Sequence, residues 1–493
     1  MRSDAESPDP GADGDGTATF EPADLPDDPQ LAVEELIADA DVDLEELASN
    51  VDDLVYVAEL TPAEAAESAA TEVDPHAVIG GPAFAEDRIA AKTWALFLGL
   101  ALVMIGNGLQ GAVLGLRSEA EGFGVGVTGL VMTAYFCGFL VGSRYAEHAV
   151  QTVGHIRTFS ALASTASATA LVHVLIVEPI AWGLMRFVFG LCMAGLYVVI
   201  ESWLNDLGTN ATRGRLLAIY MLVTMAGITI GQFMINLAES TEFTLFAVSS
   251  VAVSVSLVPI ALSAAAAPSA KEPKRVRVRQ LVEWAPTGVV CSFLSGAGLG
   301  ALVGLSAVYA AATDMTPQRI SFFLAAPMIG SIVFQWPVGA VSDRVPRRGV
   351  IVTMALLSAG CGLALFMVPT GSWAAVGVMF VLGGVAFPLY SLAIAVTIDW
   401  IPEGTLVGAT AALVRINGAG AIAGPLAVAG LMAVDRDLFF AVQVVPYLAI
   451  AGYTLYRIFV RDAVPLDEQV PYQAIPARAS ASVARLLPRQ RRR

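Results

Sequence analysis

The residues best suited to chemistry are a few charged side chains that lie inside long apolar stretches. Arg186 and Arg415 each lie well within such a stretch, and Glu201 lies near the end of the one that holds Arg186. A charge in hydrocarbon is costly and usually faces a cavity or a partner. Because an arginine stays protonated, Arg186 and Arg415 could bind an anionic solute group but could not carry a proton. The alternative for Arg186 is a structural pair, or a side chain that reaches the membrane surface.

Carboxylates at the ends of two apolar stretches are candidates for proton transfer. Glu201 ends the fourth such stretch and Asp399 follows the tenth. A carboxylate in a dry site can gain and lose a proton as its surroundings change. The alternative is that both carboxylates are solvated at the membrane surface.

Amide side chains in the apolar stretches could bind polar groups of a solute. Asn107 and Gln110 are three residues apart and so share a helical face, and Gln232 and Asn417 lie in two further stretches. Each amide could equally form a hydrogen bond between two helices. Together with the charged residues named above, these amides form the predicted pathway for solute and proton.

Motifs that would indicate an enzyme or an ATP-driven pump are missing from the sequence. There is no G-x-x-x-x-G-K-[ST] phosphate loop, no H-E-x-x-H zinc motif and no G-x-S-x-G nucleophile motif. The four cysteines show no C-x-x-C spacing, so neither a zinc site nor a disulfide framework is predicted. We therefore expect no enzyme activity, no cofactor and no bound metal.

The elements that carry these residues are long apolar segments. The chain has 493 residues, of which 56% are hydrophobic and only 15% charged, whereas soluble domains have about 25% charged residues. A membrane-spanning helix needs about 20 apolar residues. Twelve stretches meet this requirement: 93–116, 125–142, 157–176, 180–202, 216–237, 243–265, 286–310, 319–340, 349–369, 372–394, 405–432 and 438–459. Because backbone polar groups in lipid must be satisfied within their own segment, we predict an all-α membrane protein with twelve transmembrane helices.

Charge is distributed unevenly along the chain. Residues 1–90 hold 25 Asp and Glu against two Arg, a composition that predicts a disordered cytoplasmic extension, with a docking or regulatory segment as the alternative. In the loops between the spans, twelve basic residues lie on one side and three on the other, which predicts that both termini are cytoplasmic. The basic tail, 461–493, is expected on the same side, where it could contact anionic lipid.

The two halves of the membrane part repeat each other. FVFGLCMAGLY at 187–197 matches FVLGGVAFPLY at 380–390, and AGITIG at 226–231 matches AGAIAG at 419–424, both at an offset of 193 residues. Chance similarity between apolar segments is the alternative. We predict six-helix bundles at 91–265 and 286–460, joined by a basic cytoplasmic linker at 266–285. Secondary transporters are commonly duplicated in this way, with the binding site between the halves.

The loop between the second and third spans of each half carries a charged pattern. In the second half it reads GAVSDRVPRR, which matches G-x-x-x-D-R-x-G-R-R apart from a proline in place of the second glycine. In the first half only Gly154 and the nearby Arg157, one residue past the pattern's last arginine, still fit, so this copy is degraded. The matching residues of the second copy are Gly339, Asp343, Arg344, Arg347 and Arg348.

This pattern resembles the signature of the major facilitator superfamily, and RFVFGLCMAG at 186–195 resembles a second motif of that family. FQWPVGAVSDR, ESWL and RGRLLAIYM together resemble its YcaD-like subgroup. The resemblance covers residues 91–460 and implies the major facilitator fold. It also implies that the charged loop biases which side of the protein is open, by contacts made in only one conformation. The alternative is that the arginines only hold the loop in the cytoplasm.

These observations predict a secondary active transporter that moves a small solute across the inner (plasma) membrane by alternating access, coupled to protons. The alternatives are a passive uniporter and a non-transporting membrane sensor or scaffold that uses the acidic extension. We expect a small-molecule substrate with a coupled proton, a lipid bilayer around a monomer, and no nucleic-acid partner.

Overall fold

The computed structural model describes residues 82–208, 212–262, 276–313, 315–402, 404–461, 464–466, 469–470, 472–473 and 475. Regular structure in these ranges is helical throughout, without a strand. Twelve helical segments in them are long and apolar enough to cross a membrane, which confirms the predicted fold class. The predicted acidic extension lies outside the described residues, except for its end, where a helix begins at Pro82.

The twelve spans follow one another in chain order. The first six are α5 (Pro82–Ala120), α6 (Val125–Val153), α7 (His155–Leu175), α8 (Pro179–Leu207), α9 (Arg213–Phe233) with η2 (Met234–Leu237), and α10 (Phe243–Val255) with α11 (Leu257–Ala261). The last six are α13 (Pro286–Ala311), α14 (Pro317–Ser342), α15 (Arg347–Met367), α16 (Trp373–Ala386) with α17 (Pro388–Ile398), α18 (Leu406–Met432), and η3 (Arg436–Phe440) with α19 (Ala441–Val460). Residues 85–493 form one compact unit.

Several helices extend beyond the apolar stretch that predicts them. Helix α6 ends at Val153 rather than at residue 142, and α8 ends at Leu207 rather than at residue 202. The hydropathy criterion detects only the part of a helix that suits hydrocarbon, whereas charged residues such as those of RYAEH at 144–148 are compatible with a helix in water. A further short helix, α12 (Val278–Trp284), lies within the predicted linker.

Helix starts are set by capping side chains, and one span is broken by a proline. Glu178 caps α8 by accepting a hydrogen bond from the backbone N–H of Ala181 at 3.0 Å, and Ser372 caps α16 in the same way. Such side-chain acceptors satisfy N–H groups that the first helical turn leaves open. The tenth span is divided into α16 and α17 just before Pro388, because proline has no N–H for the helical ladder.

Glycines at equivalent positions allow the same close helix packing in both halves. A methyl group on Gly138 in α6 would overlap the backbone oxygen of Phe187 in α8, and one on Gly330 in α14 would overlap that of Phe380 in α16. Phe187 and Phe380 are separated by 193 residues, which is the offset of the sequence repeat. Small residues let membrane helices approach closely, and this close contact therefore occurs once in each predicted half.

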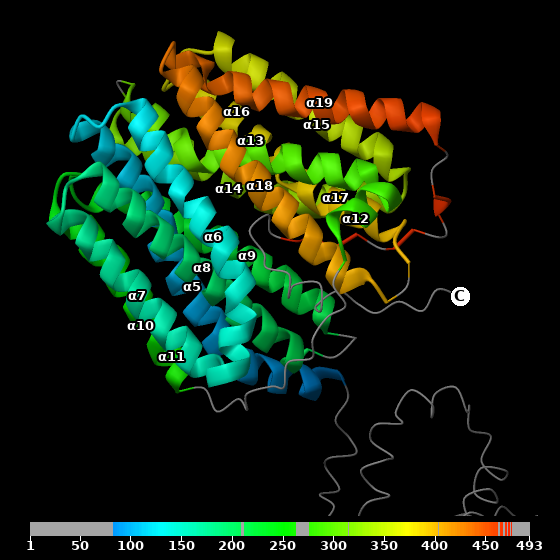
Figure 1. The fold of residues 1–493 in the computed structure, drawn as a ribbon, viewed down its shortest axis with the longest axis horizontal. Helices are drawn as coiled ribbons and strands as arrows, with labels where there is room; N and C mark the ends of the chain where they lie inside the picture. Colours follow the sequence, from blue (N-terminus) through cyan, green and yellow to red (C-terminus); the bar gives the residue numbers. More distant parts are fainter. Residues whose placement is uncertain are drawn as a thin grey trace, which may run out of the picture. The chain divides into compact units, whose positions relative to one another are not determined.

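The two halves meet at one face of the bundle. We call the face where α6, α8, α17 and α19 end the tail face, and the other one the opposite face. At the opposite face, the rings of Phe233 and Phe322 lie 5.0 Å apart, and the amide of Asn236 donates to the hydroxyl of Ser321 at 2.9 Å. Figure 1 shows α6 of the first half beside α18 of the second.

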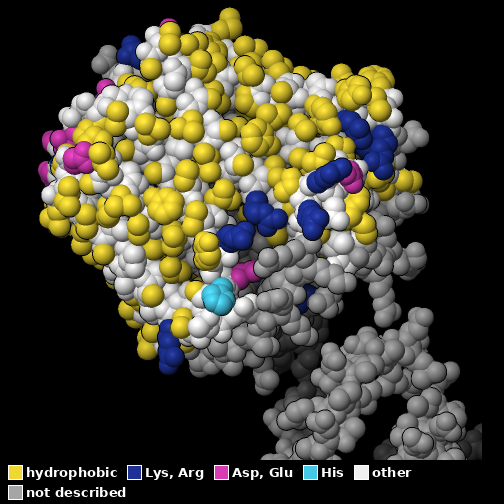
Figure 2. Space-filling view, in the orientation of Figure 1, with side chains coloured by type: hydrophobic (Ala, Val, Ile, Leu, Met, Phe, Trp, Pro, Cys, Tyr) yellow, Lys and Arg dark blue, Asp and Glu magenta, His cyan; other side chains and the backbone are white. Residues whose placement is uncertain are grey.

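The outer surface of the described helices is apolar. Figure 2 shows hydrophobic side chains over most of the visible face, with most of the basic side chains toward the right of the view. Large apolar groups such as Leu184 (58% exposed) and Trp336 (80%) point outward. Exposed apolar groups in this number suit contact with lipid rather than water, and the protein is thus a multi-pass membrane protein.

Candidate functional site

A cavity lies between the two halves, in the middle of the bundle. The empty space at this site, counting space open to solvent, is about 820 Å³, and it is lined by residues of α6, α8, α9, α13, α14 and α18 and by the residue between α16 and α17. The lining residues are Tyr135, Phe136, Phe139, Leu140, Ser143, Tyr197, Met225, Ile228, Gly296, Leu299, Gly300, Val303, Met328, Phe387, Val414, Asn417, Gly418 and Ala421. A cavity with walls from both halves is in a position to respond to any movement between them.

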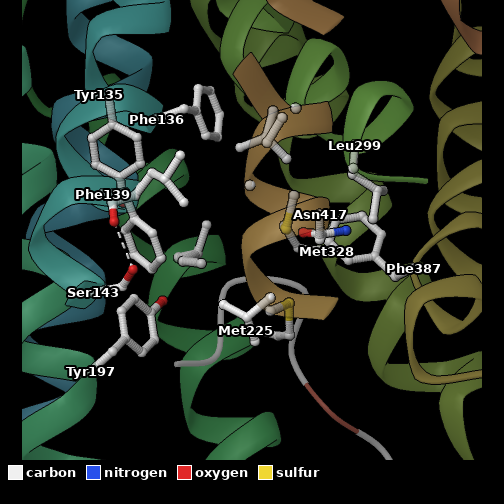
Figure 3. Close-up of a pocket in the computed structure, with 18 residues that line it drawn as sticks. Tyr135, Phe136, Phe139, Ser143, Tyr197, Met225, Leu299, Met328, Phe387 and Asn417 are labelled. Carbon is white, nitrogen blue, oxygen red and sulfur yellow. Dashed lines mark hydrogen bonds between the residues drawn. The ribbon is translucent and has the colours of Figure 1, made fainter. Parts of the chain in front are cut away.

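The wall of this cavity is mainly aromatic and aliphatic. Figure 3 shows the rings of Tyr135, Phe139 and Tyr197 on one side of the cavity and that of Phe387 on the other. Phe387 is placed there by the break in the tenth span just before Pro388. Such walls favour ligands with an apolar or aromatic body, which aromatic side chains bind through a large contact area.

A second, more polar hollow adjoins the cavity and shares four lining residues with it. Its empty space, counting space open to solvent, is about 480 Å³, and its wall includes Asn107, Arg186 and Gln232. The guanidinium of Arg186 lies over the ring of Tyr135, at 4.7 Å from its centroid. This cation–π contact helps to hold the charge in a buried place, since the Arg186 residue is only 5% exposed.

Asn417 is a polar group of the aromatic cavity itself. Its amide nitrogen donates to the backbone oxygen of Ser292 at 3.0 Å, which fixes the side chain against α13. Figure 3 shows the amide oxygen on the cavity side, where it can accept a hydrogen bond from a solute. Together the two hollows bring four of the predicted pathway residues to one place: Asn107, Arg186, Gln232 and Asn417.

Glu201 does not line either hollow, but it is fully buried at the tail-face end of α8. The hydroxyl of Tyr220 in α9 donates to its Oε1 atom at 2.6 Å. The carboxylate also lies close enough to Tyr390 of α17 to interact with it electrostatically. Glu201 is thus a carboxylate out of contact with solvent that interacts with residues of both halves.

The other two predicted pathway residues lie outside the cavity walls. Arg415 is exposed on α18, one residue after the cavity residue Val414. Gln110 is buried in α5, one turn from Asn107, and both atoms of its amide group lack a hydrogen-bond partner. Asn107 and Gln110 were predicted to share a helical face, but only Asn107 lines the hollow. The other residues of α5 in its wall are Gly108, Gly111 and Ala112.

The charged loop of the second half is held by close polar contacts. The Nη1 atom of Arg347 lies 2.6 Å from both carboxylate oxygens of Asp399 at the end of α17. Asp343 lies 3.7 Å from the Nη2 atom of the same arginine. Arg348 donates to the backbone oxygens of Arg457 and Arg461 at the end of α19, a place where the helix dipole favours a cation.

The remaining residues of the loop pattern are more exposed. Arg344 and Arg157 are exposed at the tail face. Gly154 has φ of +86° between α6 and α7, a conformation that favours glycine. Asp399 is buried and paired with Arg347 rather than solvated at a membrane surface.

The aromatic lining is the part of the site that sequence reasoning missed. Tyr135, Phe139, Tyr197 and Phe387 all lie in apolar stretches, where an aromatic ring is equally suited to lipid, to the helix packing or to a cavity. The only sign of this lining in the sequence was the presence of tyrosines within the spans. A buried tyrosine hydroxyl usually needs a polar partner, so such tyrosines are candidates for a polar site. Burial confirms an interior position for these rings, with Tyr197 at 0% and Tyr135 at 2% exposure.

Comparison with known proteins finds similarity to members of one superfamily. A sequence profile described as Major Facilitator Superfamily matches residues 288–491. A protein of Yersinia pestis (strain Pestoides F), named an uncharacterized MFS-type transporter, is 26% identical over 77% of this chain and 97% of its own length. A protein with the same description in Enterobacter sp. (strain 638) is 29% identical over 72% of this chain and 92% of its own. The MFS-type transporter YcaD of Escherichia fergusonii is 26% identical with the same coverage.

Solved structures with the same fold include two of the nucleoside transporter NupG. A point mutant of NupG superposes with a TM-score of 0.64 over 74% of this chain and 99% of that chain, at 12% identity. Another structure of NupG gives a TM-score of 0.57 over 75% and 97%. At this identity the likeness concerns the fold and not the solute.

Proposed function

Since the chain has the major facilitator fold and is similar in sequence to transporters of that superfamily, including YcaD, we propose that it moves a small solute by alternating access, coupled to protons. The resemblance seen in the loop motif is confirmed by these similarities, which support a transporter. The observation that carries the proposal is the central cavity, whose walls come from both repeats while the halves are in contact at the opposite face. Rocking of the halves about such a cavity would expose it to each side in turn.

The tail face is assigned to the cytoplasm of the inner membrane. Arg157 and Arg344, which belong to the set of twelve basic loop residues, lie at this face, and basic loops favour the cytoplasmic side. In this orientation the described conformation is closed toward the outside. Fusions of a reporter enzyme to residue 313 and to residue 461 should then report outside and inside, respectively.

The solute is proposed to be amphipathic, with an apolar ring or chain and an anionic or strongly polar group. The aromatic walls of the larger hollow suit the apolar body. Arg186, Asn107 and Gln232 of the smaller hollow suit the polar group, because a permanent positive charge in a buried wall attracts an anion strongly.

Proton coupling is proposed to depend on Glu201. Its carboxylate is buried, accepts a hydrogen bond from Tyr220 and interacts electrostatically with Tyr390 of the other half. Movement between the halves would change these surroundings, and with them the proton affinity of the carboxylate. Arg186 cannot take this role because it stays protonated.

The binding part of the proposal is tested by a thermal-shift screen of the purified chain. Small organic acids, sugars and amphipathic drugs are compared, since a ligand of the folded state raises the unfolding temperature. We expect amphipathic acids to stabilise the protein, and Arg186→Gln to remove this effect. The matched control is Arg319→Gln, since Arg319 stacks on Trp373 outside the cavity. Equal loss in both variants would contradict the proposed site.

The coupling part is tested in proteoliposomes with a ligand found in that screen. Glu201→Gln should abolish accumulation driven by a pH gradient, while exchange of labelled for unlabelled solute continues. Gradient-driven accumulation at the parent rate in this variant would exclude Glu201 as the proton site. Accumulation that ignores the gradient in the parent protein would favour the passive uniporter instead.

A further inference from the structure

Part of the C-terminal tail returns to the tail face and binds the charged loop. The backbone N–H of Val470 donates to Asp399 at 3.2 Å, and that of Tyr472 donates to Asp343 at 2.8 Å. Arg347 donates to the backbone oxygen of Val470. Two N–H groups that are two residues apart and point to the same side are the pattern of an extended chain. The charged loop therefore holds this part of the tail by its backbone.

The side chain of Tyr472 is fitted to the loop glycine. Its hydroxyl accepts a hydrogen bond from Gln335 of α14 at 2.6 Å. Its ring lies directly over Gly339, so that a methyl group added to Gly339 would come within 2.6 Å of the ring carbon Cδ1. Burial raises the pKa of the Tyr472 phenol, which therefore stays neutral in this place. The first glycine of the loop pattern thus leaves room for a tail residue.

Ile475 extends this contact toward the centre of the bundle. Its backbone N–H donates to the hydroxyl of Ser391 in α17, and this hydroxyl donates to its backbone oxygen, both at 3.0 Å. Ile475 is only 1% exposed. Ser391 lies about one helical turn beyond Phe387, which lines the central cavity. Figure 1 shows the red trace of the tail on the side of the bundle where α19 ends.

The same segment also reaches the first half. The side-chain oxygen of Gln473 lies 3.8 Å from the position that a Cβ atom on Gly214 would take, at the start of α9. The tail lies between Asp343 and Ser391 of the second half and Gly214 of the first half. It therefore occupies the space into which the two halves would move to close this face. The contacts at Phe233 and Phe322 already close the opposite face.

We propose that the described tail residues 469, 470, 472, 473 and 475 form a latch, which closes the tail-face mouth of the cavity and keeps the halves apart at that face. While the latch is docked, the cavity is closed at both faces, and the halves cannot come together at the tail face. Release of the latch opens the cavity to this side and permits the alternation on which the proposed function rests. The loop pattern of the second half is the docking surface, and its natural ligand is the chain's own tail.

The latch is tested by the access of a water-soluble thiol reagent to the cavity, without any solute. The cavity residue Ser143 is replaced by Cys in a full chain whose four native cysteines are replaced by Ala. Labelling is compared between this parent, a chain truncated after residue 468, and the parent with Gly339→Ala. Removing a latch that is docked most of the time should raise the labelling rate roughly tenfold in the truncated chain, and Gly339→Ala should raise it in the same direction.

The matched control is Gly349→Ala, since no atom lies within 4 Å of the position where its Cβ would be added. This variant should label at the parent rate. Equal rates in the parent, the truncated chain and Gly339→Ala would overturn the latch, and so would slower labelling after truncation. If the truncated chain does not purify as a single species, the two glycine variants decide the result.

A cross-link tests the bridge between tail and first half directly. In the cysteine-free chain, Gly214→Cys and Gln473→Cys should be joined by a short bifunctional thiol reagent that spans the length of a glutamine side chain, detected as a linked peptide by mass spectrometry. Failure to form the link would also overturn the proposal. Neither measurement needs a solute. The latch is therefore tested separately from the solute site, which is tested by Arg186→Gln in the binding screen.

Discussion

Removing one member of the ion pair between Arg347 and Asp399 should destabilise the protein strongly. The side chains are only 2% and 3% exposed, and the guanidinium Nη1 atom lies 2.6 Å from both carboxylate oxygens. Loss of one partner leaves the other charge buried without its counter-ion, which costs about 3–5 kcal/mol. We therefore expect Arg347→Met and Asp399→Leu each to lower the free energy of unfolding by about this amount.

The double variant Arg347→Met with Asp399→Leu should be much more stable than either single one. It removes both charges, and a buried ion pair replaced by apolar groups is often nearly neutral. Two tail contacts are lost as well, because Val470 donates to Asp399 and accepts from Arg347. At roughly 0.5–1.5 kcal/mol for each net hydrogen bond, the double variant should remain about 1–3 kcal/mol below the parent.

The measurement is an unfolding titration of the purified full chain with a denaturing detergent in mixed micelles. Arg344→Met is the control, because it lies in the same loop but is exposed, and we expect it to unfold like the parent. The reasoning is refuted if the single variants unfold like this control. It is also refuted if the double variant loses as much stability as the two single variants added together, since the charges would then be independent.

The packing glycines and the buried tyrosine give two further predictions. Gly190→Ala and Gly383→Ala should each lower the free energy of unfolding by about 1–3 kcal/mol in the same titration. In both variants the new methyl group would overlap the backbone of a neighbouring helix. The control Gly183→Ala places its methyl group where no atom lies within 4 Å, and it should be tolerated. Tyr220→Phe removes the hydroxyl that donates to Glu201 and should lower the free energy of unfolding by about 1–3 kcal/mol; stability equal to that of the parent would argue against a charged Glu201.

The spans were predictable because their signal is local. An apolar segment of sufficient length must be a helix in lipid, whatever surrounds it, and each of the twelve predicted stretches overlaps one of the twelve spans found in the described residues. The same argument fails at the ends, as in α6, because the criterion reports the thickness of hydrocarbon rather than the length of the helix. The helix α12 escaped prediction since a short charged segment carries little periodic signal.

The site was predictable only where a residue type is costly in lipid. Arg186 and Asn417 stand out from their apolar stretches, and both line the hollows. Phe387 does not stand out, because its place in the wall follows from the break at Pro388 and from the packing of other spans. The contact of Tyr472 with the loop joins positions more than a hundred residues apart, a relation that no local pattern contains.

The duplicated halves are alike in packing but different in their loops, and this difference bears on control of the transport cycle. In the first loop, Gln151 and Thr152 stand where the pattern has Asp and Arg, and both are exposed. In the second loop, Asp343 and Arg347 bind the tail that follows the second half. If helix packing alone controlled the transport cycle, two repeats with matching contacts would contribute equally to it. We therefore expect charge changes in the second loop to alter access to the cavity, and the same changes in the first loop to leave the thiol labelling of the cavity unaltered.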